Sequence, residues 1–378
     1  MNQKIYSGYN THKKLHNILR EFSPRKVFLV TGRKSYFLSG AENLSGKIIS
    51  EFDYIRFCDF EPNPKLQDIK RGLDLFNKEN CDFVIGVGGG SVMDIAKAIS
   101  LLATQRGKLR EFSGEGVSFE QRRIPSVMIP TTAGTGSEST HFSTIYTGKV
   151  KHSLSHNSLL PDFAILDPVF TESLPPYITA CTGMDALCQG IESFWSINST
   201  EESRMFSEQA IKLAAANIVK CVNNPDKKSR RNMLMASNFS GRAINIAKTT
   251  AAHAVSYPLT SYFNIPHGHA VSLTLPYFIE FNYNVSPGNL RDSRGIEFTK
   301  NIMNKLIGIL GADTSGEAKE KIINIMKEIN LEVRLSGLGV SRDSIGIIVK
   351  NGLDPQRIKN NPRLVSQPDL RDLIRRIM

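Results

Sequence analysis

The sequence lacks any apolar run long enough to cross a bilayer, because stretches such as FVIGVGGGSVM are short and broken by glycine. Its first residues, MNQKIYSGYNTHKKL, lack the apolar core of a signal peptide. It has only five cysteines, which are scattered and form no CxxC pair, so neither a disulfide framework nor a zinc knuckle is expected. These absences predict a cytoplasmic protein with reduced thiols and no membrane partner.

The chain also lacks the clustered basic and aromatic residues of a nucleic-acid-binding protein, although its net charge is +11. Its basic clusters, DKKSRRN and LRDLIRRIM, are short and contain no interleaved aromatics. The charge is therefore interpreted as a solvated basic surface, and no nucleic-acid partner is expected. A positive field that attracts a small anionic substrate is the alternative interpretation.

What the sequence does contain is a regular alternation of short apolar strands with amphipathic segments in its first half. Strands are predicted at 26–32, 83–90, 126–132 and 163–168, and a β-ribbon at 141–148. This alternation is typical of a parallel sheet with helices on both faces. After Pro175 and Pro176 helical periodicity dominates, and Thr200 is a candidate helix N-cap.

With 378 residues, the chain is long enough for two domains. We expect an α/β dinucleotide-binding domain over residues 1–176 and an all-α domain over residues 177–378, with no internal repeat.

Two glycine-rich or hydroxyl-rich loops follow strands of the predicted sheet. Gly88, Gly89 and Gly90 precede a helix for which Ser91 is the expected cap, and this helix N-terminus is suited to an anion. The segment PTTAGTGSEST, residues 130–140, follows another strand. Either loop alone could be a tight turn, but two at the carboxyl ends of strands in one sheet indicate a nucleotide crevice.

The motifs GGGSVMDIAKA, PTTAGTGSE, LDP, GMDAL and PHG, in this order, resemble the iron-containing (group III) alcohol dehydrogenase family over essentially the whole chain. The resemblance implies a Rossmann-like N-terminal domain and a helical C-terminal domain, the dehydroquinate synthase-like two-domain architecture. It also implies a metal and a nicotinamide in the cleft between them, hydride transfer between alcohols and aldehydes, and a homodimer or larger assembly.

The family's metal is held by one aspartate and three histidines, and these positions fall on Asp185, Gln189, His253 and His267. Gln189 stands where the family usually has histidine, and its neutral amide oxygen is a weaker ligand for a late transition metal. The expected ion is Fe²⁺, with Zn²⁺ or another divalent ion as alternatives. If no metal binds, the two histidines are hydrogen-bonding or proton-transfer residues.

The predicted catalytic residues are His267 and Tyr257. Tyr257 occupies a position where the family commonly has histidine, one helical turn after His253, and its hydroxyl could relay a proton. His269 is a further candidate proton shuttle, with simple surface exposure as the alternative.

The expected cofactor is NADPH or NADH. Many NAD-preferring members have an aspartate after the first strand, whereas this chain has Gly32, Arg33 and Lys34, which favours or tolerates the 2′-phosphate of NADPH. The alternative is that both cations face solvent. The predicted nucleotide contacts are Gly32, Arg33, Gly88, Gly89, Gly90, Ser91, Asp94, Thr131, Thr132, Thr135, Ser137 and Lys151.

A lysine lies on the segment that leads to His253, where many family members have small or apolar residues. Lys248, Thr249 and, further away, Arg242 are predicted to bind an oxyanion, with Lys248 on a helix facing the substrate. The segments ALCQGIESFWSINSTEESR and INIAKTTAAHAVSY resemble the phosphonoacetaldehyde reductase branch of the family. The expected reaction is therefore NAD(P)H-dependent reduction of phosphonoacetaldehyde to 2-hydroxyethylphosphonate.

Three alternatives remain open at this point. The first is a general metal-dependent alcohol or aldehyde dehydrogenase with no anion preference. The second is a lyase related to dehydroquinate synthase, for which the larger set of polar and basic residues in the substrate cleft is not found. The third is a nucleotide-binding homologue without catalysis.

Overall fold

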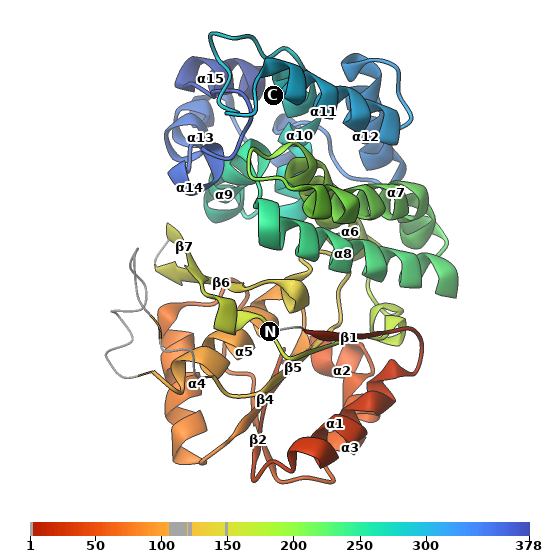
Figure 1. Cartoon of the computed structure of the whole chain (residues 1–378), viewed down its shortest axis with the longest axis vertical. Helices are drawn as coiled ribbons and strands as arrows, with labels where there is room; N and C mark the ends of the chain where they lie inside the picture. Colours follow the sequence, from red (N-terminus) through yellow and green to blue (C-terminus); the bar gives the residue numbers. More distant parts are fainter. Residues whose placement is uncertain (1–2, 106–118, 120–122, 148–149) are drawn as a thin grey trace. The chain divides into compact units, whose positions relative to one another are not determined.

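The computed structural model describes residues 3–105, 119, 123–147 and 150–378. The chain divides into two compact units, Met1–Leu174 and Pro175–Met378. The first contains a parallel sheet with flanking helices, and the regular structure of the second is helical (Figure 1). This is the predicted fold class, an α/β domain followed by an all-α domain.

Six parallel strands in the order β1-β8-β5-β4-β2-β3 form the sheet of the first unit. They are β1 (Lys4–Ser7), β2 (Val27–Thr31), β3 (Tyr54–Phe57), β4 (Phe83–Gly88), β5 (Ser126–Pro130) and β8 (Phe163–Leu166). The strands predicted at 26–32, 83–90, 126–132 and 163–168 are thus present, as β2, β4, β5 and β8.

The sequence prediction missed β1 and β3, and both are edge strands. Residues of β2, β4, β5 and β8 are buried throughout, whereas β1 and β3 are partly exposed along their length. Their sequences, KIYS and YIRF, mix polar with apolar residues because one side of an edge strand faces no neighbouring strand. A search for apolar runs therefore does not find them.

Helices cover both faces of this sheet (Figure 1). They are α1 (Lys14–Phe22), α2 (Ser35–Leu38), α3 (Lys47–Ile49), α4 (Leu66–Lys78) and α5 (Gly90–Leu102). Successive residues of a strand point to opposite faces. Leu29 and Ile85 accordingly pack in one core with α1 to α3, and Phe28 and Val84 pack in the other with α4 and α5.

A two-stranded antiparallel ribbon, β6 (Phe142–Thr147) and β7 (Val150–Ser155), follows the second loop, as predicted for 141–148. The helix after the first loop differs from expectation at its start. Gly89, in an extended conformation, is the N-cap of α5, and Ser91 is already the second helical residue. The Ser91 hydroxyl instead accepts a hydrogen bond from the backbone N–H of Asn63 at 3.2 Å.

The second unit consists of ten α-helices. They are α6 (Pro176–Trp195), α7 (Glu201–Asn223), α8 (Lys227–Ala247), α9 (Ala251–Phe263), α10 (His267–Tyr283), α11 (Ile296–Ile309), α12 (Ser315–Glu328), α13 (Ile345–Asn351), α14 (Pro355–Ile358) and α15 (Gln367–Arg376). Thr200 caps α7 through a capping box with Ser203, as predicted. Along the described parts of the chain, no helix combines the length and the apolar character that a membrane crossing requires.

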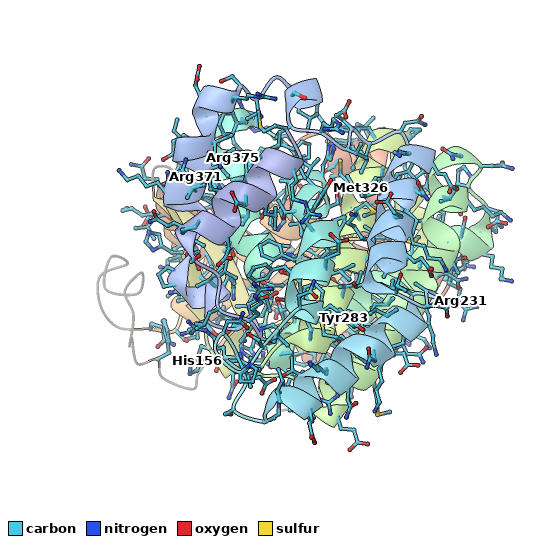
Figure 2. The ribbon with its side chains drawn as sticks, turned by 90° about the horizontal axis from the view of Figure 1, so that it is seen from above. His156, Arg231, Tyr283, Met326, Arg371 and Arg375 are labelled. Carbon is cyan, nitrogen blue, oxygen red and sulfur yellow. The ribbon has the colours of Figure 1, made fainter. Side chains whose placement is uncertain are left out.

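The two short basic clusters of the sequence lie on separate helices of the second unit. Arg231 belongs to α8, and Arg371 and Arg375 belong to α15 (Figure 2). Arg231 and Arg375 are exposed and Arg371 is partly exposed. These three side chains fit the predicted solvated surface, but Arg230 of the first cluster is buried and donates to the Thr179 hydroxyl at 3.0 Å.

One lysine of the first unit is completely enclosed. The ammonium group of Lys97, on α5, donates to Ser137 Oγ at 2.7 Å, to the Ser137 carbonyl at 2.9 Å and to Thr140 Oγ1 at 3.0 Å. The carboxylate of Asp94, one turn earlier, lies 3.5 Å away. Lys97 therefore ties the loop after β5 to the helix that follows β4.

We predict that Lys97→Met destabilises the first unit by about 3–5 kcal/mol, because removing one partner leaves the Asp94 charge and several buried acceptors uncompensated. Denaturant unfolding followed by circular dichroism measures this. Lys78→Met, at the exposed end of α4, is the control and should change the unfolding free energy by less than about 0.5 kcal/mol. Equal stability of the two variants would show that Lys97 is dispensable for holding the loop.

Candidate functional site

Three predicted metal ligands from three different helices converge in the second unit. Asp185 lies on α6, His253 on α9, and His267 is the first residue of α10. Their ligand atoms all lie within 4.8 Å of one another. Nε2 of His253 is 3.5 Å and Nε2 of His267 is 3.8 Å from Asp185 Oδ1. Ligands about 2.1 Å from a shared ion lie roughly 3.4 Å apart, so a small contraction would complete the site.

The chemistry of these groups also fits a metal. Nε2 of His253 is buried and has no hydrogen-bond partner among the described residues. An unsatisfied buried polar atom is costly, and a bound cation would satisfy it. Two imidazoles and one carboxylate form a ligand set that suits Fe²⁺ or Zn²⁺.

A buried carboxylate that the sequence prediction missed, Glu192, fixes the orientation of His253. Its Oε2 contacts His253 Nδ1, and its Oε1 accepts from the backbone N–H of Ala252 at 2.8 Å and from the Thr250 hydroxyl at 2.8 Å. Nδ1–H donation to a carboxylate leaves Nε2 as the lone-pair nitrogen, the form a metal requires. Glu192 follows Asp185 by seven residues and so shares its helix face, a signal that could have identified it.

Protonation of His253 competes with metal binding. Burial disfavours the imidazolium, but the negative charges of Glu192 and Asp185, together with the hydrogen bond to Glu192, outweigh it and raise the pKa of His253 to about 9. Because a metal-bound nitrogen carries no proton, metal binding releases a proton and is expected to weaken as the pH falls.

Close approach of α10 to α6 requires a glycine after His267. A Cβ atom on Gly268 would lie 1.9 Å from the Cys181 carbonyl oxygen and 2.9 Å from Asp185 Cβ. Both neighbours are backbone or rigid atoms of α6, so any side chain would push the two helices apart. The glycine of the PHG motif thus allows His267 to face Asp185.

Gln189 lies on the same face of α6, one turn after Asp185, and is buried. Its Oε1, the atom expected to bind the metal, accepts a hydrogen bond from Ser240 Oγ at 3.0 Å. An amide oxygen has a second lone pair, so this contact is compatible with metal binding but weakens it further. Gln189 as fourth ligand stays a prediction.

Tyr257 and His267 lie side by side at the metal centre. Their rings stack at an interplanar angle of 26°, with centroids 6.4 Å apart. The Tyr257 hydroxyl accepts a hydrogen bond from Nε of Arg357 at 3.0 Å. Arg357 was not predicted, and it lies 100 positions away in the chain. His269 is buried, so the alternative of simple surface exposure does not hold. Its Nε2 contacts the Glu332 carbonyl oxygen at 2.7 Å and its Nδ1 lies 3.4 Å from the Tyr177 hydroxyl, and its role as a proton shuttle stays a prediction.

The position of Lys248 corrects the sequence prediction. Helix α8 ends at Ala247 and α9 starts at Ala251, so Lys248 lies in the link between helices and not on the helix of His253. It adopts φ 64° and ψ 168°, a conformation that favours glycine. Burial, together with repulsion from Arg357, lowers the pKa of Lys248 to about 8.

The other two predicted anion ligands, Thr249 and Arg242, lie in different segments. Thr249 follows Lys248 in the link and is buried. Arg242 lies within α8, where its guanidinium stacks 3.8 Å from the centre of the Phe206 ring. The Phe206 ring belongs to α7, so the guanidinium of Arg242 packs against another helix, and burial lowers the pKa of Arg242.

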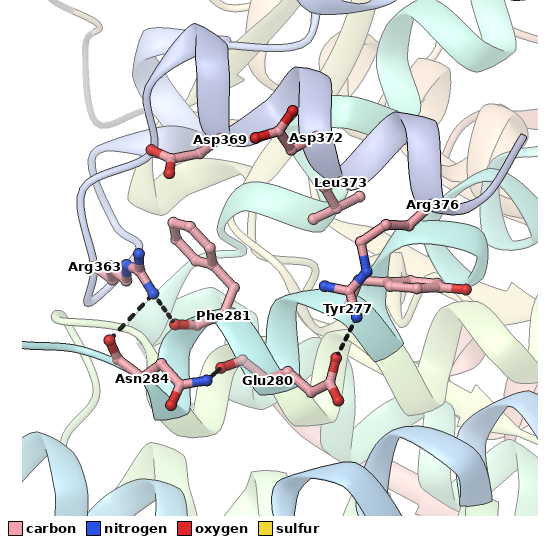
Figure 3. Close-up of a pocket in the computed structure, with 9 residues that line it drawn as sticks. All are labelled: Tyr277, Glu280, Phe281, Asn284, Arg363, Asp369, Asp372, Leu373 and Arg376. Atoms are coloured by element: carbon pink, nitrogen blue, oxygen red, sulfur yellow. Dashed lines mark hydrogen bonds and ion pairs between the residues drawn. The ribbon is translucent and has the colours of Figure 1, made fainter.

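A surface pocket between α10 and α15 is separate from the metal centre (Figure 3). Its volume is about 340 Å³. Glu280, on its wall, follows His267 by 13 residues on α10, which corresponds to about 20 Å along the helix axis. Arg376 pairs with Glu280 at 2.7 Å and Arg363 donates to the Phe281 carbonyl at 2.8 Å. Its arginines therefore already have protein partners.

In the first unit, the two predicted nucleotide loops touch. Strands β4 and β5 pair with Gly88 opposite Pro130, so both loops leave the same edge of the sheet. A Cβ atom on Gly90 would lie 2.9 Å from Thr135 Cγ2, and one on Gly89 would lie 3.3 Å from Thr132 Oγ1. Bare backbone at the start of α5 therefore faces the hydroxyl-bearing loop, the arrangement that suits a phosphate.

The remaining predicted nucleotide contacts lie in different elements of the first unit. Asp94 accepts from Ser137 Oγ at 2.8 Å and from the backbone N–H of Thr144 at 3.1 Å, so both predicted residues help hold the second loop. Thr131 is buried directly after β5. Lys151 belongs to β7, and its side chain lies outside the described part of the structure.

A carboxylate from another strand lies beside the cations that follow β2. Arg33 forms an ion pair with Asp59, and Asp59 Oδ2 is also 3.2 Å from Nε of Arg71. Asp59 comes from the chain just after β3, which pairs with β2. An acidic residue at the end of the second strand is a common ribose ligand in dinucleotide-binding folds. It was missed because β3 was missed.

We predict that Glu192→Gln weakens metal binding by about 10- to 100-fold. The glutamine amide would donate to Nδ1 of His253, so Nε2 would carry the proton and lose its ligand lone pair. Metal content after purification without added metal, and Fe²⁺ or Zn²⁺ titration, measure this. The exposed Glu201→Gln on α7 is the matched control. Unchanged metal affinity in Glu192→Gln would contradict the assignment of His253 as an Nε2 ligand.

Comparison with known proteins places both units in one family. Residues 2–168 match the iron-containing alcohol dehydrogenase family, and residues 179–378 match the C-terminal part of the Fe-containing alcohol dehydrogenase family. Long-chain-alcohol dehydrogenase 1 of Geobacillus thermodenitrificans is 30% identical over 83% of this chain and 80% of its own. The 1,3-propanediol dehydrogenase of Citrobacter freundii is 31% identical over 85% and 83%.

Solved structures agree with this assignment. The sulfoacetaldehyde reductase of Bifidobacterium kashiwanohense, in complex with NAD⁺, aligns with a TM-score of 0.87 and 30% identity, covering 99% of this chain and 96% of that one. With both family matches spanning nearly all of its length, the chain belongs to the iron-containing alcohol dehydrogenase family.

Proposed function

We propose that this protein reduces phosphonoacetaldehyde, a small anionic aldehyde, to 2-hydroxyethylphosphonate with a reduced nicotinamide cofactor. The observation that carries the proposal is Lys248. It is a largely enclosed cation in a glycine-like conformation, three residues before the first residue of the helix that bears His253. Enclosing a lysine and straining its backbone both cost free energy, and binding of a substrate anion would offset part of that cost.

The comparison with a sulfoacetaldehyde reductase supports an anionic substrate. Its substrate, by name, carries a sulfonate on a two-carbon aldehyde. A phosphonate presents three similar oxygens around a tetrahedral centre and can carry one more negative charge. A lysine ammonium group suits both, since it binds such oxygens as a point charge.

The residues of the metal centre have distinct parts in the proposed reaction. Asp185, His253 and His267 would hold a divalent ion, Fe²⁺ by family, with Gln189 as the weaker fourth ligand. When bound, the ion polarises the carbonyl oxygen, and the reduced nicotinamide supplies a hydride to the carbonyl carbon. The carbonyl oxygen then requires one proton to give the alcohol.

Tyr257 is suited to deliver that proton. Its oxygen accepts the Nε–H of Arg357, so its own O–H can donate to another group. The guanidinium cation stabilises the negative charge that develops on the phenol oxygen as the proton leaves. Its ring stacks on His267, which keeps the hydroxyl beside the metal centre.

Both NADPH and NADH are proposed as cofactors, with selectivity set at Asp59. Asp59 resembles the acidic ribose ligand of NAD-binding folds, whereas its partners Arg33 and Arg71 could bind a 2′-phosphate. The NAD⁺ complex of the sulfoacetaldehyde reductase supports use of the unphosphorylated cofactor.

A general alcohol dehydrogenase without anion preference is the second candidate. It is favoured by relatives such as the 1,3-propanediol dehydrogenase, whose named substrate is uncharged. The same metal centre would serve both reactions, so the two candidates differ in whether a substrate anion binds beside it, and Lys248 is the first residue that tests this. Nucleotide binding without turnover on either substrate class would instead indicate a non-catalytic homologue.

We predict that Lys248→Ala raises KM for phosphonoacetaldehyde by about 10- to 100-fold, because a charge-assisted hydrogen bond contributes about 1.5–3 kcal/mol. KM for an uncharged aldehyde of similar size, such as propanal, should change much less. Steady-state kinetics on both substrates measure the difference.

The exposed Lys305→Ala on α11 is the control for removal of a positive charge, and it should leave both KM values unchanged. Equal losses of Lys248→Ala on charged and uncharged aldehydes would remove Lys248 from the anion site. A wild-type enzyme that prefers the uncharged aldehyde would support the general alcohol dehydrogenase.

We predict that Asp59→Asn shifts cofactor preference toward NADPH. Removing the carboxylate leaves Arg33 available to the 2′-phosphate, whereas Arg71 keeps its ion pair with Asp68 at 2.6 Å. An exposed charge interaction of about 1 kcal/mol corresponds to roughly a fivefold change. The ratio of kcat/KM for NADPH to that for NADH measures this. Asp74→Asn, exposed on α4, is the control. An unchanged ratio in Asp59→Asn would place the ribose elsewhere.

A further inference from the structure

A second cation, Arg357, lies at the metal centre on a different segment from Lys248. It belongs to α14, a four-residue helix whose N-cap Asp354 accepts the backbone N–H of Arg357 through Oδ1 at 3.0 Å. This turn packs against α9 and directs the guanidinium to Tyr257, whose hydroxyl oxygen accepts from Nε at 3.0 Å. Two hydrogen bonds thus fix the position of Arg357: one from its backbone N–H to Asp354, and one from its Nε to Tyr257.

The other end of the Arg357 side chain has no partner within the described parts of the protein. Neither Nη atom makes a hydrogen bond there, and no carboxylate lies within ion-pair distance. Arg33 and Arg294, by comparison, each pair with an aspartate. An arginine fork with both Nη groups available is suited to two parallel hydrogen bonds with an oxyanion.

A hydrogen bond joins the segment that contains Lys248 to the segment that contains Arg357. Asn360, three residues after Arg357, donates through Nδ2 to the carbonyl of Thr249 at 2.9 Å. The link that carries Lys248 is also held by the Thr250 hydroxyl, which donates to Glu192 at 2.8 Å. The two cations are close enough that repulsion from Arg357 contributes to the lowered pKa of Lys248.

We propose that Arg357 and Lys248 together form a two-cation site for the oxyanion of the substrate, in which Arg357 determines specificity through its two Nη groups. This inference rests on the proposed reduction of an anionic aldehyde. Two like charges in a largely enclosed site repel each other, and a bound phosphonate would convert that repulsion into attraction for both.

Because Arg357 would contact both the proton donor and the oxyanion, it also limits the length of the substrate. Its Nε holds the hydroxyl proposed to protonate the carbonyl oxygen, while its Nη groups bind the oxyanion. The two functional ends of the substrate must therefore reach adjacent atoms of one side chain. A single methylene between carbonyl carbon and phosphorus, as in phosphonoacetaldehyde, satisfies this, and the site should disfavour 3-phosphonopropanal.

The test compares Arg357→Gln, Arg357→Lys and Tyr257→Phe in the metal-loaded full-length enzyme. Substrates are phosphonoacetaldehyde, 3-phosphonopropanal and propanal, and methylphosphonate is the competitive inhibitor. For Arg357→Gln we expect KM for phosphonoacetaldehyde and Ki for methylphosphonate to rise by about 10- to 100-fold. KM for propanal should change by less than about threefold, since an uncharged aldehyde loses no charge-assisted bond.

The variants separate anion binding from the positioning of Tyr257. Arg357→Gln and Tyr257→Phe should both lower kcat on every substrate, but only Arg357→Gln should raise Ki for methylphosphonate. Arg357→Lys, which keeps the charge and loses the fork, should recover part of the inhibitor affinity. Circular dichroism and the thermal midpoint establish that each variant is folded.

One result would contradict the two-cation site alone, and another would contradict the proposed function as well. If the wild-type enzyme prefers phosphonoacetaldehyde but Arg357→Gln leaves KM and Ki unchanged, Arg357 only positions Tyr257, and the two-cation site is wrong while the proposed function stands. If the wild-type enzyme shows no preference for the anionic aldehyde and methylphosphonate does not compete, the proposed function fails and this inference fails with it.

Discussion

The contact between Glu192 and His253 is the interaction on which the metal centre depends. A buried carboxylate is tolerated only where donors surround it, and Glu192 obtains them from the first turn of α9, whose N–H groups have no intrahelical partner. The same bonds that satisfy the carboxylate also turn the His253 ring so that Nε2 faces Asp185. Satisfying a buried charge and preparing a metal ligand are therefore one structural requirement.

That requirement also determines where Lys248 lies. Because α9 must begin at Ala251 to present its N–H groups to Glu192, the preceding residues cannot continue α8 into α9. Thr250 is held by Glu192 and by the indole N–H of Trp195, which donates at 2.9 Å. Lys248 must then make the turn, in a conformation that glycine would adopt more easily. The strained lysine is a consequence of how the histidine is fixed.

The sequence was most informative where physical signals are local. Fully buried strands such as β4 appear as apolar runs, whereas the half-exposed β3 does not, and with it Asp59 was lost from the predicted cofactor site. The family resemblance supplied Asp185, His253 and His267, and helix periodicity could have added Glu192. Arg357 gives no such signal, because only the long-range packing of a four-residue helix brings it to Tyr257.

Ion pairing distinguishes the two places where cations of this basic chain lie near a candidate site. After β2, Arg33 and Arg71 share Asp59, so the protein itself supplies a negative charge at the proposed ribose position. At the metal centre, Arg357 contacts a neutral hydroxyl, and within the described residues its Nη groups have no carboxylate. The charges of Asp354 and Glu192 act on Arg357 only from beyond ion-pair distance. A protein that pairs its cations directly at one site and not at the other is expected to accept an uncharged ribose at the first and, as proposed, an anion at the second. The proposed selectivity for one small anion therefore rests on this difference in ion pairing more than on the net charge of +11.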